Sequence, residues 1–281
     1  MNRNWMENDA ALAAMINLIV VLADNKYYLG RRLSEWAVGA PSLEGAVAAA
    51  ALTQEELGHA RALYPLLEEL PFPGRAETLE REKAGQRRYA ISFLLAPWPS
   101  WSHAVAALAL TDVAITTMLE HLAESNYAAL ARRAARILQE EAFHLEYAEG
   151  RVRDLAATEE GRRALAGSIE SLFPEMMLWF GPQGEPGVKA LRQEALIAGD
   201  NETWRQSYLA RIMPLLLETG VQPSASPQWD MRRRRWEYEE PPWQNWDPLE
   251  RRLKLTRTMN SSPVLGADQP MSNSSEISDR S

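Results

Sequence analysis

Long stretches rich in Ala, Leu, Glu and Arg fill most of residues 1–220, and they constrain this chain more than any other feature. These residues are strong helix formers, and runs of β-branched residues are few. Gly39 and Pro41 interrupt the pattern where a turn is needed. The pattern predicts long helices near residues 8–36, 43–70, 102–125 and 128–155, and shorter ones near 76–89, 159–180, 188–198 and 202–219. Two long hairpins joined by a crossover predict an all-α four-helix bundle with additional C-terminal helices.

The sequence after Gly220 has a different composition. It is rich in Pro, holds four of the ten tryptophans and ends in a Ser/Asn-rich segment. We therefore predict a helical domain over 1–220, an extended Trp/Pro-rich C-terminal arm over 221–258 and a disordered tail over 259–281. The arginines at 232–235 could contact a CoA phosphate or an acidic partner. Because acidic residues follow directly, a solvated, salt-bridged arm is the default interpretation.

The composition excludes several classes of chemistry. The chain has no Cys, which rules out disulfides, thiolate metal sites and a Cys nucleophile, and is compatible with the cytoplasm. The net charge of −8 argues against nucleic acid as the main partner. The longest apolar run, residues 10–23, is too short to span a membrane, and the acidic Glu7 and Asp9 precede it where a signal peptide needs positive charge. We expect a cytoplasmic protein that does not bind membranes.

Two Glu-x-x-His units stand out among these helices. Glu56 is followed three residues later by His59, and Glu141 by His144, so two of the four histidines in the chain lie in such units. Residues three apart lie on the same face of a helix, so each unit can present a carboxylate and an imidazole to one metal ion. A single unit would be weak evidence, because Glu and His are ordinary helix residues.

Spacing within the hairpins strengthens this interpretation. Asp24 and Glu56 are 32 residues apart with residue 40, at the first turn, midway between them. Asp112 and Glu141 are 29 apart, and their midpoint falls at the second turn. A buried carboxylate without a partner is costly, so the two aspartates on apolar helices need a reason. Alternatively, Asp24 pairs with a nearby base such as Lys26, and Asp112 caps or hydrogen-bonds locally.

One carboxylate from each of two helices and Glu-x-x-His from the other two is the arrangement of the dimetal sites in ferritin-like bundles. We predict two iron ions, with manganese or a mixed Mn/Fe centre equally compatible with such ligands. Tyr28, one turn beyond Asp24, could lie beside the metals or simply pack in the core. Glu55 and Glu140 each precede a ligand, either as solvated residues or as partners of the ligands. The predicted ligands are Asp24, Glu56, His59, Asp112, Glu141 and His144.

The segments Leu22–Trp36 and Gln54–Arg61 resemble the phenylacetic acid catabolic family, and the resemblance extends over roughly residues 8–220. It implies a ferritin-like fold and, in the catalytic subunits of that family, a non-haem diiron centre. Those subunits use O₂ and electrons from a reductase to epoxidise the ring of an aryl-CoA thioester, whereas the structural subunits have lost ligands. All six ligand positions are filled here, with Asp24 where Glu is usual.

We therefore expect a diiron monooxygenase subunit that epoxidises or hydroxylates phenylacetyl-CoA or a related substrate. No Gly-rich phosphate loop is visible, so electrons would come from a separate reductase. The expected partners are this small-molecule substrate, O₂, the reductase, and further copies or a related subunit in an oligomer. The alternatives are a non-catalytic structural subunit of such a complex and a ferroxidase or iron-handling protein.

Overall fold

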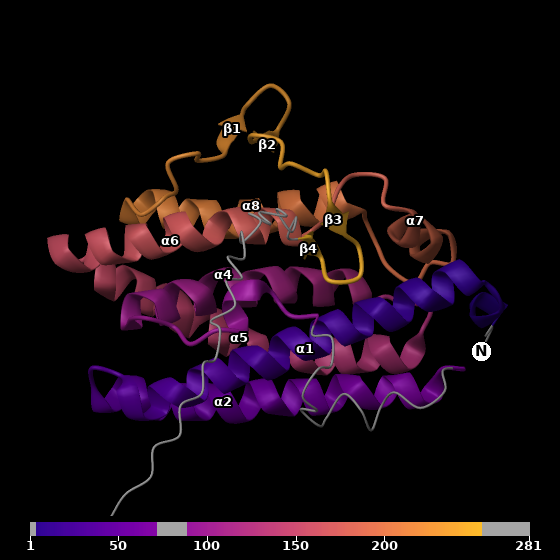
Figure 1. Cartoon of the computed structure of the whole chain (residues 1–281), viewed down its shortest axis with the longest axis horizontal. Coiled ribbons are helices and arrows are strands. Elements are labelled where there is room, and N and C mark those ends of the chain that lie inside the picture. The colour runs from indigo at the N-terminus through magenta and orange to yellow at the C-terminus, as the bar shows by residue number, and fades with distance from the viewer. Residues whose placement is uncertain (1–3, 72–88, 255–281) are drawn as a thin grey trace, which may run out of the picture.

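The computed structural model describes residues 4–71 and 89–254, which form a bundle of helices with a small C-terminal arm (Figure 1). The helices are α1 (Asp9–Gly39), α2 (Leu43–Leu63), α4 (Trp101–Leu122), α5 (Ala128–Ala156), α6 (Glu159–Trp179), α7 (Pro186–Gln193) and α8 (Asn201–Thr219). Short 3-10 helices are η1 (Asn4–Glu7), η2 (Tyr64–Glu69) and η3 (Ser92–Leu94). The strands are β1 (Gln228–Asp230), β2 (Arg235–Glu237), β3 (Trp246–Asp247) and β4 (Arg252–Leu253).

The two long hairpins, α1–α2 and α4–α5, pack against each other, which confirms the predicted all-α four-helix bundle. Helix α4 is its most deeply buried element, since every residue from Ala104 to Leu119 is buried. A helix that is apolar on all sides must be covered on all sides. Helices α6 and α8 supply the cover by packing on α4 from the side opposite α1 and α2 (Figure 1).

Side-chain caps fix where five of the helices begin. In each case the capping side chain accepts a hydrogen bond from the backbone N–H three residues further along the chain. Such a bond satisfies one of the donors that a helix start leaves without a partner. The capping residues are Asn8, Ser42, Ser100, Thr158 and Asp200.

Two helices end earlier than the sequence pattern predicts. Helix α2 ends at Leu63 because Pro65 has no N–H to continue the helical hydrogen bonds, and the chain goes on as η2. Helix α7 ends at Gln193, and Ala195 then adopts a left-handed backbone conformation with φ of 51°. The short helix predicted near 76–89 lies, except for its last residue, outside the described residues, and the tail predicted over 259–281 lies outside them entirely.

The described part of the C-terminal arm forms two short antiparallel hairpins that are fastened to the bundle by buried arginines. Arg251 donates to the carbonyl oxygens of Trp179 (2.7 Å) and Phe180 (2.6 Å) and pairs with Glu185 at 3.3 Å. Arg205, on α8, similarly reaches the arm through the hydroxyl of Tyr238 at 3.0 Å. Helix-end carbonyls and buried charges thus satisfy one another, and the arm packs on α6–α8.

Two helices, α1 and α4, are long and apolar enough to cross a membrane by length and composition alone. However, 67% of the most apolar stretch of α1 and 94% of that of α4 is buried inside the bundle. Burial in the core therefore accounts for their apolar character.

Helices α1 and α2 approach most closely where a glycine faces the second helix. A Cβ on Gly30 would lie 3.1 Å from both the Cβ of Glu56 and the Cγ of Leu57. A Cβ on Gly150, in α5, would meet nothing within 4 Å. We expect Gly150→Ala to raise the free energy of unfolding by about 0.5–1 kcal/mol through helix propensity. Gly30→Ala should instead lower it by about 1–3 kcal/mol through overpacking.

Urea denaturation of the two variants and the wild type measures this difference. Equal stabilisation by both substitutions would show that α1 and α2 are not in such close contact.

Candidate metal centre

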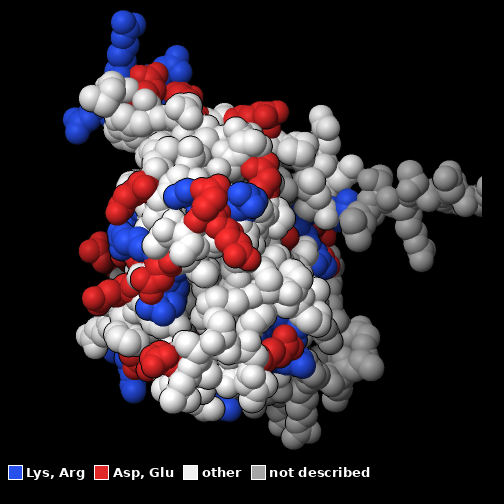
Figure 2. Space-filling view, turned by 90° about the vertical axis from the view of Figure 1, so that its left-hand side faces the viewer, with Lys and Arg blue, Asp and Glu red and all other residues white. Residues whose placement is uncertain are grey.

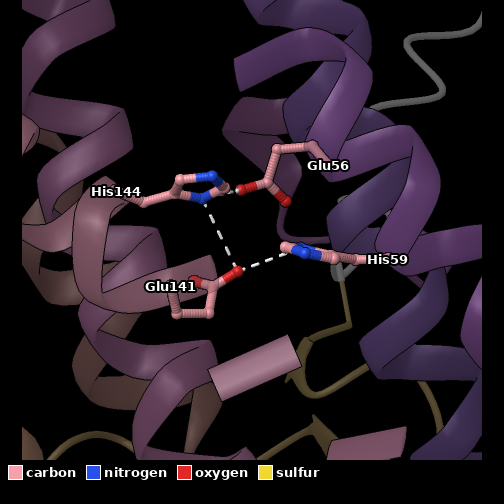
Figure 3. A group of neighbouring side chains, drawn as sticks. All are labelled: Glu56, His59, Glu141 and His144. Atoms are coloured by element: carbon pink, nitrogen blue, oxygen red, sulfur yellow. Dashed lines mark hydrogen bonds and ion pairs between the residues drawn. The ribbon is translucent and has the colours of Figure 1, made fainter. Parts of the chain in front are cut away.

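Five of the six predicted ligands come together in the middle of the bundle. Helix α2 contributes Glu56 and His59, α5 contributes Glu141 and His144, and α4 contributes Asp112 (Figure 3). The five residues are at most 2% exposed. The ligand atoms of the four Glu and His residues lie within 4.8 Å of one another, which is close enough to hold one metal ion.

The residue that α1 contributes to this cluster is Lys26, not Asp24. The Lys26 Nζ lies 3.0 Å from Glu56, 3.2 Å from Asp112 and 2.7 Å from Glu141. Its side chain is fully buried, so the ammonium group stands among three carboxyl groups in the centre of the bundle. The alternative considered from the sequence, an Asp24–Lys26 pair, is not what the structure shows for Lys26.

Asp24 lies on another side of α1. Its carboxylate accepts hydrogen bonds from the hydroxyl of Tyr64 and from the backbone N–H of Tyr89, both at 2.8 Å. Burial, reinforced by the negative charge of Asp24, raises the pKa of Tyr64 and keeps it a donor. Successive residues of a helix are about 100° apart, so residues 24 and 26 point in nearly opposite directions. Asp24 therefore ties α1 to η2 and to the chain before η3.

A signal for Lys26 was present in the sequence. Gly30 marks the face of α1 that touches α2, and Lys26 lies one turn before Gly30 on that same face. Asp24 instead shares its face with Tyr28, which is buried and packs its ring edge-on against Tyr27 at 5.2 Å. The close-packing glycine, rather than the distance from the turn, indicates which residue faces the cluster.

The charges in the cluster balance one another. Burial disfavours the charged form of Lys26, but Asp112, Glu141 and Glu56 outweigh it and raise the pKa of Lys26. Burial likewise opposes protonation of His144, yet its bond to Glu56 and the surrounding carboxylates raise its pKa to about 10. Burial raises the pKa of Asp112 well above its usual range, against the effect of Lys26. Burial pushes the pKa of Glu141 upward, but Lys26 and the two histidines lower it overall.

Each histidine connects the cluster with the surface. His144 directs Nδ1 inward, 3.1 Å from Glu56, and its Nε2 contacts Glu55. His59 directs Nδ1 toward Glu141 at 3.0 Å, and its Nε2 lies 2.8 Å from Glu140. The side chains of Glu55 and Glu140 are 43% and 44% exposed. Glu55 and Glu140 are therefore partners of the histidines, and each joins α2 to α5.

The donor atoms fit a cation at this place. In the part of the chain that the structure describes, Glu56 Oε2, His59 Nδ1 and Asp112 Oδ2 are buried without a hydrogen bond. The first of these lies 3.0 Å from the Lys26 Nζ, but not in a hydrogen-bonding direction. Such atoms suit a metal ion, which accepts lone pairs without that directional demand. The set fits one ion directly, whereas the predicted first-helix carboxylate for a second ion is replaced by an ammonium group.

One further neighbour was not predicted. Thr116, one turn after Asp112 on α4, donates its hydroxyl to Glu141 Oε2 at 3.1 Å. The remaining histidines, His103 and His121, lie elsewhere on α4, and burial lowers the pKa of both.

Comparison with known proteins agrees with this architecture. The family model described as phenylacetic acid catabolic protein matches residues 1–260. The chain belongs to that family. This confirms the resemblance seen in the sequence and connects the chain with phenylacetate catabolism.

A relative within reach of sequence comparison is one of the subunits of the 1,2-phenylacetyl-CoA epoxidase from Escherichia coli (strain K12), 28% identical over 129 residues. The match covers 46% of this chain and 52% of the relative, so the chain matches about half of that subunit's length. The relative is thus part of a multi-subunit oxidoreductase.

A solved structure with a similar fold is a Synechococcus protein described as having aldehyde deformylating oxidase activity. It superimposes with a TM-score of 0.54 at 15% identity, covering 75% of this chain and 92% of that one. At this identity the likeness concerns the fold, a ferritin-like helical bundle.

Lys26 determines the stability of the bundle when no metal is bound. We expect Lys26→Met in EDTA to lower the free energy of unfolding at pH 7 by about 3–5 kcal/mol, because it leaves buried carboxylates without their counter-charge. Lys189→Met, at an exposed position on α7, should change it by no more than about 0.5 kcal/mol. Chemical denaturation of both variants measures the effect, and an unchanged Lys26→Met protein would contradict the central role of the ammonium group.

His144 should make stability depend on pH in the alkaline range. Its pKa is raised to about 10 in the folded state, against an unfolded value of about 6.5. The proton-linked stabilisation is therefore complete below about pH 6.5 and is lost as the pH rises through about 10, a change on the order of 4 kcal/mol. Denaturation of wild type and His144→Gln in EDTA at pH 6, 8 and 10 should show their difference shrinking with pH. A constant difference would disprove the linkage.

Proposed function

We propose that this chain is the metal-binding subunit of an O₂-using oxidoreductase that acts on phenylacetyl-CoA or a related aryl-CoA. The observation that carries the proposal is the convergence of Glu56, His59, Glu141 and His144 in a buried cluster. Family membership and the epoxidase named for the E. coli relative supply the substrate class. Electrons would come from a separate reductase, and the subunit would work in a complex with related chains.

The residues assign themselves distinct tasks in such a site. Glu56 and Glu141 offer carboxylate oxygens, and the inward Nδ1 atoms of His59 and His144 offer nitrogen. Glu55 and Glu140 hold the outer Nε2 atoms and so fix the orientation of each ring. Iron bound there would supply the O₂ chemistry, and manganese is compatible with the same ligands. Asp112 is in place as a further carboxylate for one ion or for a second one.

Lys26 sets a condition for metal binding. A divalent ion within reach of Glu56 and Glu141 has to displace the ammonium group or share the carboxylates with it, since Lys26 lies 3.0 and 2.7 Å from them. His144 must also lose its proton before its nitrogen can bind a metal. Metal binding should therefore release protons and strengthen as the pH rises.

A second candidate function is favoured by the same lysine. Three carboxyl contacts within 3.2 Å give the cluster a built-in cation, so the fold is electrostatically complete without a metal. This arrangement suits a non-catalytic subunit that supports a metal-bearing one.

Metal titration distinguishes the two candidates. We expect the wild-type protein, titrated anaerobically with Fe²⁺ or Mn²⁺ in a calorimeter, to bind metal at the cluster. His144→Gln should lose at least about tenfold in affinity, as loss of a metal contact typically does, whereas Asp24→Asn should bind like the wild type because Asp24 faces Tyr64.

Activity completes the experiment. Iron-loaded protein, supplied with a reductase and phenylacetyl-CoA, should consume O₂. If the wild type binds no metal while Lys26→Met does, the second candidate is correct and the first is rejected. Loss of binding in Asp24→Asn would contradict the ligand set.

A further inference from the structure

The tip of the β1–β2 hairpin projects from the bundle above α6 and α8 (Figure 1). Trp229 is 44% exposed and Met231 is 78% exposed, so two large apolar side chains face solvent there. Arg232 and Arg234 are also exposed, and neither forms an ion pair with any part of the chain that the structure describes. Figure 2 shows Lys and Arg side chains at the outermost point of this projection. The tip thus combines apolar surface with unneutralised positive charge.

The hairpin is held firmly in this projecting position. The side chain of Gln206, on α8, donates to the carbonyl of Trp236 and accepts from its N–H, both at 2.8 Å. Arg235 pairs with Glu202 of the same helix at 3.1 Å. A two-stranded hairpin alone is marginally stable in water. These bonds extend the hairpin onto α8 and keep its apolar tip directed away from its own core.

A groove with complementary properties lies at the base of the same hairpin. It has a volume of about 260 Å³, and α6 contributes its floor through Phe173 and Met177. Prolines from both legs of the hairpin form its walls, and three carboxylates stand at its rim: Glu170, Glu239 and Glu240. Among the described residues none of the three pairs with Lys, Arg or His. Ser224 bonds to Glu170 twice, at 2.6 Å, and lowers its pKa, which keeps it charged.

The tip cannot reach the groove of its own chain. The tip is the turn between β1 and β2, while the groove lies between α6 and the segments 223–227 and 238–242, at the opposite end of the hairpin. Two hairpins placed side by side in opposite directions, however, bring each tip to the base of the other. A twofold axis between two copies produces this placement and makes both contacts identical.

We infer that two copies of this chain associate through reciprocal exchange of these hairpins. Trp229 and Met231 of each copy would fill the apolar groove of the other, since Trp, Met and Arg are the side chains enriched in protein interfaces. Arg232 and Arg234 would meet the carboxylates at the rim. The surface is separate from the metal cluster, so this inference does not depend on the proposed function.

Sedimentation velocity of the full chain tests the inference by charge exchange. The wild type should shift from monomer to dimer as its concentration rises. Arg232→Glu combined with Arg234→Glu should weaken association on the order of 100-fold, because like charges then face each other. Glu239→Arg combined with Glu240→Arg should do the same. An equimolar mixture of these two proteins should form heterodimers through its complementary tip and groove.

A matched control changes the charge equally elsewhere. Arg132→Glu combined with Lys189→Glu alters two exposed positions on α5 and α7 and should leave the dimer intact. Thermal unfolding by circular dichroism verifies that every variant is folded. A wild type that stays monomeric up to high concentration would overturn the inference. So would a dimer that both charge reversals leave unchanged, or association with a different subunit only.

Discussion

A single ammonium group in the middle of a helical bundle sets the terms for the surrounding structure. Taking the Lys26 charge out of water costs several kcal/mol, and three carboxyl contacts between 2.7 and 3.2 Å are what compensate for it. Those carboxyl groups come from α2, α4 and α5, so the ammonium group on α1 links all four helices. Sliding or rotating any one helix would leave a charge buried without a partner. The cluster therefore specifies the register of the bundle as well as a candidate site.

The two Glu-x-x-His helices use the residue before each motif in the same way. Glu55 of α2 contacts the histidine of α5, and Glu140 of α5 contacts the histidine of α2. Each helix thus supplies an inner carboxylate, a histidine and an outer carboxylate for the histidine opposite. The histidines are held at both nitrogens, which fixes the direction of the inward Nδ1 atoms before any ligand arrives. This pairing explains why both motifs read Glu-Glu-x-x-His.

The fold and most of the cluster could be predicted from the sequence, because caps, helical periodicity and Glu-x-x-His spacing are local signals. The distance from the hairpin turn gives the height of a residue along the bundle, but not the direction of its side chain. Residues 24 and 26 differ in height by only about 3 Å, yet they point about 200° apart around the helix. A carboxylate was expected to serve as the ligand, so Asp24 was predicted and Lys26 was treated as its partner. Only the packing at Gly30 reveals which one faces inward.

Metal affinity and metal-free stability are opposed in such a cluster. Every contact that stabilises the Lys26 ammonium among the carboxylates must be given up or shared when a metal ion binds, so it lowers the apparent affinity for the metal. An oxygenase subunit needs this balance to favour the metal, while a supporting subunit needs it to favour the lysine. The same set of residues can serve both roles, and small changes in packing around α1 would move the chain from one to the other. The close contact of Gly30 with Glu56, one turn from Lys26, lies where such a change would act.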